Sequence, residues 1–153
     1  GRFCALVAPM LVGEDHPLYA VNGVFNGILV EGNMADKLMF YGRGAGSLPT
    51  ASAVVSDVIE MAKNPGETLL TSWSSEKLPL ADRGSWTGRY FVRMEGSREE
   101  KRVLLGEIFG DVSYVEIPGL KEFGFVTPVM TEAEYDQKAA QAGGVIHMLR
   151  IAR

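Results

Sequence analysis

The chain has 153 residues, of which 46% are hydrophobic and 22% are charged, a composition typical of a globular protein with one sizeable core or two small ones. The formal net charge is -4 and the basic residues are scattered, which argues against a nucleic acid or an anionic membrane surface as a partner. A single cysteine excludes an internal disulfide framework, and the apolar runs are too short to span a bilayer, so we expect a cytoplasmic protein.

The first part of the chain is predicted to form short strands, a glycine-rich loop and one long helix. The expected elements are an apolar β-rich stretch, a helical turn, two strands and the helix, over residues 2–12, 18–21, 25–31, 37–41 and 50–63. Val54, Val58 and Ala62 recur on one face of that helix. Valine is a poor helix former, so the helix is expected to depend on tertiary packing. Cys4 lies in an apolar run and is expected to be buried.

Residues 67–88 are rich in Ser, Gly and Pro and predict a linker, with a short strand around Leu69–Trp73. Its two tryptophans, Trp73 and Trp86, are expected to anchor the linker by packing against the rest of the protein.

From residue 89 onward the apolar pattern predicts the element order β-α-β-β-α-β. The strands and helices are expected over residues 89–95, 98–109, 112–117, 123–130, 132–142 and 145–152. Two capping boxes mark the helix starts, one from Ser97 to Glu100 and the other from Thr131 to Glu134. They fall at the two places where this arrangement requires a helix to begin.

Three alternating glycines, Gly42, Gly44 and Gly46, lie between a predicted strand and the long helix. A strand, a glycine loop and a helix start can bind an anion, because the helix start offers free N–H groups and a positive dipole end. The same geometry also suits a tight packing corner. The spacing is neither that of the dinucleotide fingerprint nor that of the P-loop, so the loop is not expected to hold a nucleotide by itself.

Other catalytic chemistry has little support in the sequence. His16 and His147 are the only histidines, and both are expected to be structural. Neither has a second His, Cys or carboxylate at metal-ligand spacing, so we predict no metal site. No Gly-x-Ser-x-Gly occurs, which leaves no nucleophile elbow for a hydrolase.

A specific resemblance rests on two stretches, His16-Pro17-Leu18-Tyr19-Ala20 and Gly42-Arg43-Gly44-Ala45-Gly46-Ser47-Leu48-Pro49-Thr50-Ala51. They resemble the C-terminal portion of homoserine dehydrogenase, whose pattern runs His-Pro-Leu-Ala and then Gly-x-Gly-Ala-Gly-x-x-Pro-Thr-Ala. Bacterial members often continue into an ACT domain, a βαββαβ regulatory module, and the end of this chain fits that order. The resemblance implies NAD(P)-dependent interconversion of L-aspartate 4-semialdehyde and L-homoserine, in threonine and methionine biosynthesis.

The resemblance also implies that this chain is a fragment. The family's N-terminal Rossmann domain and catalytic lysine have no counterpart here, so we expect no catalytic residue, no bound cofactor and no activity from the 153 residues alone. In the parent enzyme, Gly44 or Gly46 is expected to touch NAD or NADP, and Gly46 is favoured. In the parent enzyme the long helix would cover the Rossmann sheet. Without that sheet, the Val54 and Val58 stripe needs another apolar surface, so a homodimer or higher homo-oligomer is expected.

The expected fold class is α+β, with three parts. Residues 1–66 form part of a mixed-sheet substrate domain with one long helix, residues 67–88 the linker, and residues 89–153 a ferredoxin-like ACT domain. By resemblance, Gly96 and Ser97 stand where an amino-acid effector binds, but the family's Pro-Gly turn is replaced by charged residues. Dimerisation and effector binding therefore remain alternative roles for the ACT domain. The alternative for the whole chain is a non-catalytic ACT-type sensing or dimerisation module.

Overall fold

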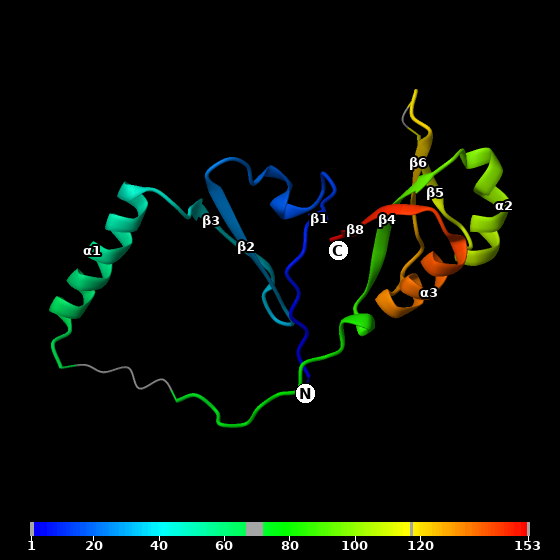
Figure 1. The fold of residues 1–153 in the computed structure, drawn as a ribbon. Helices are drawn as coiled ribbons and strands as arrows, with labels where there is room; N and C mark the ends of the chain where they lie inside the picture. The colour runs from blue at the N-terminus through cyan, green and yellow to red at the C-terminus, as the bar shows by residue number, and fades with distance from the viewer. Residues whose placement is uncertain (1, 67–71, 117, 153) are drawn as a thin grey trace. The chain divides into compact units, whose positions relative to one another are not determined.

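The structure is a computed structural model that describes residues 2–66, 72–116 and 118–152 (Figure 1). Its contacts divide the chain into two compact units. The first unit comprises Gly1–Val12 together with Glu76–Arg153, and the second comprises Gly13–Ser75. These bounds differ from the predicted 1–66, 67–88 and 89–153, chiefly because the first twelve residues lie with the C-terminal part of the chain.

The first unit contains the predicted βαββαβ arrangement. Its elements are β4 (Thr87–Glu95), α2 (Arg98–Phe109), β5 (Ser113–Glu116), β6 (Glu122–Val126), β7 (Met130–Thr131), α3 (Glu132–Ala142) and β8 (Val145–Ile151). The strand order is β1-β8-β4-β6-β5, where β1 is Met10–Leu11 near the N-terminus, and β7 pairs with β4. β4 is antiparallel to both of its long neighbours, β6 and β8. This order is that of a ferredoxin-like fold, and the α+β class predicted from the sequence is confirmed.

The core of this unit follows from the alternation along β4. Tyr90, Val92 and Met94 point to one face of the sheet and are completely buried, because α2 and α3 cover that face. From α2, Leu105 and Phe109 pack into the same cluster. The apolar face of β4, which comes from every second residue, thus packs directly against the apolar face of α2.

The helix boundaries are set by the predicted caps. Ser97 and Thr131 each form a complete capping box, with Glu100 and Glu134 respectively. The predicted strand over 123–130 ends early instead, at Val126. Pro128 has no N–H to donate to a sheet, so the pairing stops and resumes only in the short β7.

The N-terminal segment adds to the edge of this sheet. In it, β1 (Met10–Leu11) pairs in parallel with the end of β8. Phe3 forms a separate parallel bridge with Leu80. This segment lies over the surface of the unit and not in its core, so Cys4 is exposed and the expectation that it is buried was wrong.

The predicted linker is partly ordered against the first unit. A 3-10 turn, η2 (Arg83–Ser85), precedes β4 and was not predicted. Trp86 packs against the core, as expected of an anchor, whereas Trp73 is 91% exposed and anchors nothing. The strand predicted around Leu69–Trp73 lies largely outside the described residues, and Ser72 and Trp73 belong to no strand.

The second unit consists of a turn, a hairpin and a helix. The elements are η1 (Pro17–Ala20), β2 (Phe25–Gly32), β3 (Asp36–Arg43) and α1 (Ser47–Lys63). β2 and β3 pair over their full length. α1 begins three residues before the predicted start, since the first turn of a helix tolerates a proline such as Pro49. Val54 and Val58 are more than half exposed, so the apolar stripe of α1 is open in this chain.

Candidate functional site

The glycine loop lies where the hairpin ends and α1 begins. Asn26 pairs with Gly42 in the hairpin, and the ring of Phe25 stacks on Tyr41 with centroids 4.9 Å apart. The guanidinium of Arg43 lies over the Phe25 ring, 5.3 Å from its centre. These contacts fix the end of β3 from which the loop departs.

Two glycines of the loop are required by its geometry. At Gly44 a Cβ atom would lie 2.1 Å from Nδ2 of Asn26, so no side chain fits without moving that amide. Gly46 has φ 118° and ψ 156°, a conformation that is open essentially to glycine alone. Gly42 has open space around it and an ordinary φ. Of the three glycines, the two singled out in the sequence are therefore constrained, Gly44 by the side chain of Asn26 and Gly46 by its own backbone conformation.

The helix start behind the loop is uncapped. Gly46 is the N-cap of α1 and has no side chain, and its carbonyl accepts a hydrogen bond from Thr50 N at 3.2 Å. No side chain caps the first turn of α1, so the helix start next to the glycines keeps uncapped N–H groups and the positive end of the helix dipole. Such a surface favours an anionic or electron-rich group of a ligand.

The two histidines lie apart from this loop. His16 caps η1, with its Nδ1 accepting a hydrogen bond from Leu18 N at 3.2 Å, which is the local role expected from the sequence. His147 is exposed on β8 opposite Arg93. Within the described residues, no group of three His, Cys, Asp or Glu side chains is placed to hold a metal ion.

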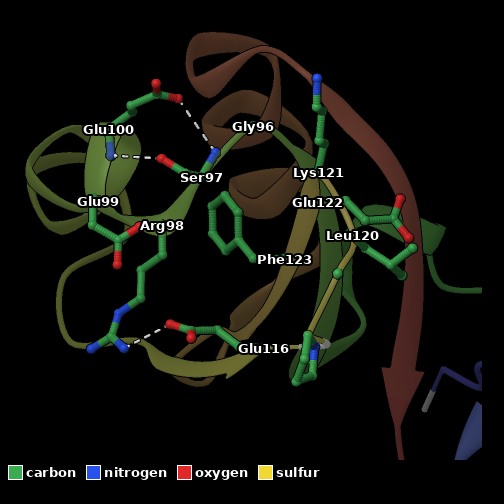
Figure 2. A pocket seen from close by; sticks show the side chains of 12 residues that line it. Gly96, Ser97, Arg98, Glu99, Glu100, Glu116, Leu120, Lys121, Glu122 and Phe123 are labelled. Atoms are coloured by element: carbon green, nitrogen blue, oxygen red, sulfur yellow. Dashed lines mark hydrogen bonds and ion pairs between the residues drawn. The ribbon is translucent and has the colours of Figure 1, made fainter.

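A cavity of about 540 Å³ lies in the first unit at the start of α2 (Figure 2). Gly96 and Ser97, the predicted effector residues, form one wall. The turn that leads into β6 forms the opposite wall, and the buried ring of Phe123 lies between them. The structure thus brings the predicted turn together with residues 116 and 118–123, which no spacing in the sequence connected to it.

The hydrogen-bond donors of the Gly96–Ser97 turn are already engaged. Ser97 N donates to the Glu100 carboxylate at 3.4 Å, and Glu100 N donates to Ser97 Oγ at 3.3 Å. Gly96 N donates to the carbonyl of Lys121 at 3.1 Å. The carboxylate of Glu100 therefore occupies the place at the helix start where a ligand carboxylate would be received.

Charges on the cavity walls are paired in a similar way. Arg98 bonds Glu116 at 2.8 Å, and this hydrogen bond raises the pKa of Arg98 above its ordinary value. Glu122 bonds Arg93 at 3.1 Å. The cavity has space for a small ligand, but its walls hold several carboxylates, so a second carboxylate would meet repulsion there.

A buried carboxylate that the sequence did not predict lies outside the glycine loop and outside the cavity at the start of α2. Glu132, the first residue of α3, is 1% exposed and contacts Arg83 and Arg150. Its neighbour in the capping box, Thr131, was recognised, but a glutamate in a first helical turn is usually exposed, so its burial had no sequence signal.

The strand order of the first unit defines a ferredoxin-like fold, and the second unit carries the glycine loop. Residues 1–59 match the sequence model of the homoserine dehydrogenase family. The chain resembles the C-terminal part of a homoserine dehydrogenase, as inferred from its glycine motif.

Curated relatives agree with this match. The homoserine dehydrogenase of Corynebacterium glutamicum is 46% identical over 98 residues, which cover 60% of this chain and 21% of that protein. The homoserine dehydrogenase of Synechocystis is 64% identical over 55 residues, 36% of this chain and 13% of that protein. The aligned part of this chain thus covers about a fifth or less of these two relatives.

Solved structures extend the likeness over nearly the whole chain. A homoserine dehydrogenase from Thiobacillus denitrificans has a TM-score of 0.71 at 21% identity, covering 94% of this chain and 38% of that one. The S. aureus homoserine dehydrogenase at pH 6.0 has a TM-score of 0.68 at 27% identity, covering 95% and 37%. In the described part of this chain, no helix is both long enough and apolar enough to cross a membrane.

Proposed function

We propose that this chain supplies the C-terminal part of a cytoplasmic, NAD(P)-dependent homoserine dehydrogenase, which interconverts L-aspartate 4-semialdehyde and L-homoserine. The observation that carries the proposal is that the constrained glycines, Gly44 and Gly46, lie inside the segment that matches the family. Nothing in the 153 residues carries the dinucleotide fingerprint, so the nucleotide-binding part and the catalytic lysine belong to other residues of the functional enzyme.

The loop residues fit a role beside the cofactor. A bound NAD or NADP supplies hydride transfer, and this chain's own residues position it. Gly46 presents bare backbone because its conformation admits essentially only glycine, and the uncapped start of α1 lies directly behind it. The loop thus lets backbone approach a planar ring closely while offering N–H groups toward it. Gly44 maintains this shape by leaving room for the Asn26 amide.

The test is a chimera in which this chain replaces the corresponding part of the Corynebacterium glutamicum enzyme, assayed for homoserine-dependent reduction of NAD and NADP. We expect activity from the chimera and none from the 153 residues alone. Gly46→Ala in the chimera should raise the KM for the cofactor or abolish turnover. Gly32→Ala is the matched control, because Gly32 lies on β2 with open space around it and an ordinary φ.

Folding of each variant is checked by circular dichroism. An active chimera in which a folded Gly46→Ala variant keeps the parent's KM and kcat would remove the cofactor role from this loop. An inactive but folded chimera would contradict the enzyme proposal itself.

The βαββαβ unit supports a second function, as an ACT-type dimerisation or amino-acid-sensing module. It has its own buried core, and the cavity at Gly96 and Ser97 lies at its surface. Analytical ultracentrifugation of the 153-residue chain should give a homodimer or a higher homo-oligomer. A monomer at all concentrations tested would contradict the dimerisation role.

A further inference from the structure

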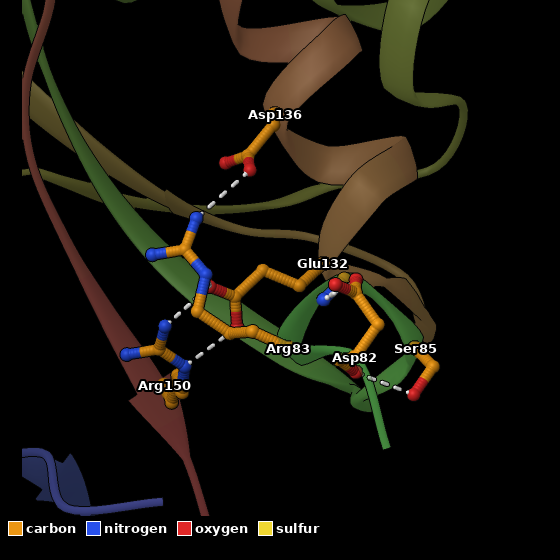
Figure 3. Close-up of polar contacts among 7 residues, drawn as sticks. Asp82, Arg83, Ser85, Glu132, Asp136 and Arg150 are labelled. Carbon is orange, nitrogen blue, oxygen red and sulfur yellow. Dashed lines mark hydrogen bonds and ion pairs between the residues drawn. The ribbon is translucent and has the colours of Figure 1, made fainter. Parts of the chain in front are cut away.

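Glu132 is a buried carboxylate at the start of α3 that two arginines engage together (Figure 3). Arg150 of β8 donates from Nε to Oε2 at 2.9 Å and from a terminal nitrogen to Oε1. Arg83 of η2 places its Nε 3.2 Å from the same Oε1. A carboxylate removed from water is strongly unfavourable unless it is paired in this way, so the burial of Glu132 depends on these arginines.

The two arginines differ in how firmly they are held. The Arg150 side chain is 12% exposed, whereas that of Arg83 is 66% exposed. The hydrogen bond to Glu132 raises the pKa of Arg150, and its guanidinium lies 5.9 Å from the Trp86 ring centre. Arg83 also forms an exposed ion pair with Asp136, with a terminal guanidinium nitrogen 3.4 Å from Oδ2. Arg83 can therefore leave while Glu132 stays paired with Arg150.

The turn that carries Arg83 is built to fit against α3. Asp82 accepts a hydrogen bond from Gly84 N at 2.7 Å and closes the turn. A Cβ on Gly84 would lie 3.2 Å from the Cβ of Ala133, so the turn packs closely on the first residues of α3. Glu132 N donates to the carbonyl of Trp86 at 2.8 Å. Side-chain and backbone contacts thus hold the same segment at one point.

The N-terminal segment is attached next to this point. Phe3 O accepts a hydrogen bond from Ala81 N at 2.7 Å, so the N-terminal segment pairs with the residues just before η2. Met10 pairs with Arg150 itself, in β8. The covalent connections between the two contact units follow Val12 and precede Glu76.

We propose that Glu132, Arg150 and Arg83 form an ionic latch that holds residues 79–86, and through them the start of the N-terminal segment at Phe3, on the βαββαβ unit. Arg150 and Glu132 form its fixed part, and Arg83 is its detachable part. When Arg83 detaches, the segment that precedes β4 loosens while the core stays folded. This device goes beyond the proposed dehydrogenase function and does not depend on it.

Amide hydrogen exchange of the whole 153-residue chain, followed residue by residue by NMR, tests the latch. Arg83→Met removes the charge and keeps most of the aliphatic stem. We expect the Ala81, Ser85 and Trp86 amides to exchange about fivefold faster, the scale of losing one partly exposed ionic contact, with the β4 and β6 amides unchanged. High salt should produce the same acceleration in the wild type and little further change in the variant.

Arg93→Met is the matched control, because Arg93 makes a similar surface ion pair, with Glu122, on the same unit. It should leave exchange at residues 79–86 as in the wild type. Unchanged exchange at these residues in Arg83→Met would overturn the latch. So would a uniform acceleration across β4 and β6, because Arg83 would then stabilise the whole unit and not one segment.

Discussion

Tyr90 of β4 stacks on Tyr135 of α3, with ring centroids 4.7 Å apart and planes 25° from parallel. Both rings are buried, and Trp86 packs edge-on against Tyr90. The Tyr90 hydroxyl has no hydrogen-bond partner among the described residues. The aromatic cluster therefore combines favourable packing with one unsatisfied polar atom.

Removing that hydroxyl should stabilise the protein. Tyr90→Phe keeps the ring and its stack, so we expect the free energy of unfolding to rise by about 1 kcal/mol, because a buried unpaired group is no longer desolvated. Urea denaturation measures the change. Tyr90→Leu is the control, since it loses the aromatic stack and should be less stable than the wild type. A clear loss of stability in Tyr90→Phe would mean that the hydroxyl has a partner in solution.

The same two tyrosines predict a loss of stability in alkali. Burial raises the pKa of Tyr90 and of Tyr135 from 10.0 to about 12. The unfolded chain therefore loses these protons at lower pH than the folded chain does, and stability that is complete below pH 10 falls as the pH rises toward 12. Denaturation curves across this range should show the fall, and Tyr90→Phe should show a smaller one. A constant free energy of unfolding over the range would refute the prediction.

The pairing of Glu134 with Thr131 should make the protein less stable at low pH. Hydrogen bonds from the Thr131 backbone, and then from its side chain, lower the pKa of Glu134 below the ordinary 4.5. The stabilising contribution is complete above that ordinary value and is lost as the pH falls through the lowered folded-state pKa. Glu134→Gln keeps the cap without a titrating group, so its stability difference from the wild type should shrink on acidification. A stability difference that stays constant on acidification would contradict the prediction.

The capping boxes and the alternation of β4 show why much of the fold could be predicted. Ser97 with Glu100 and Thr131 with Glu134 are local signals, because both partners lie within one helical turn. The position of the N-terminal segment is not local. Pairing of Met10 with Arg150 depends on which sheet edge is available after the βαββαβ unit has formed, and an apolar run of residues cannot specify that edge.

Replacing Gly124 on β6 should destabilise the fold. The ring of Phe91 lies over it, and a Cβ at Gly124 would come within 2.6 Å of that ring. Gly124→Ala should lower the free energy of unfolding by about 1–3 kcal/mol through overpacking. Gly106→Ala is the matched control, because Gly106 lies in α2 with open space around it and should gain about 0.5–1 kcal/mol. Thermal denaturation of the two variants should give shifts of opposite sign, and equal shifts would refute the assignment.

The cavity at the start of α2 predicts weak or absent threonine binding. The Glu100 carboxylate already accepts from Ser97 N and would repel the carboxylate of an amino acid. Calorimetry should detect no micromolar binding to the wild type, and Glu100→Gln should bind more tightly than the wild type does. Glu107→Gln serves as the control on the same helix. Micromolar binding to the wild type, abolished by Gly96→Ala or Ser97→Ala, would prove this prediction wrong.

The candidate sites differ in how far the sequence reveals them. Gly44 and Gly46 were identifiable because their spacing is a short motif, and the structure adds the reason that each must be glycine. The cavity needed the turn before β6, which only the pairing of β4 with β6 brings next to Gly96. The Glu132 cluster joins three elements that are distant in sequence, so the burial of its carboxylate followed from tertiary structure alone.

Pairing of β1 with β8 has a kinetic consequence. Nearly the whole chain separates Met10 from its partner Arg150, so this contact closes a very long loop. Closing such a loop lowers the entropy of the chain before the short strand contributes any stabilising contacts. The contiguous βαββαβ segment is therefore expected to fold first, and the N-terminal strand to dock last onto an edge already formed.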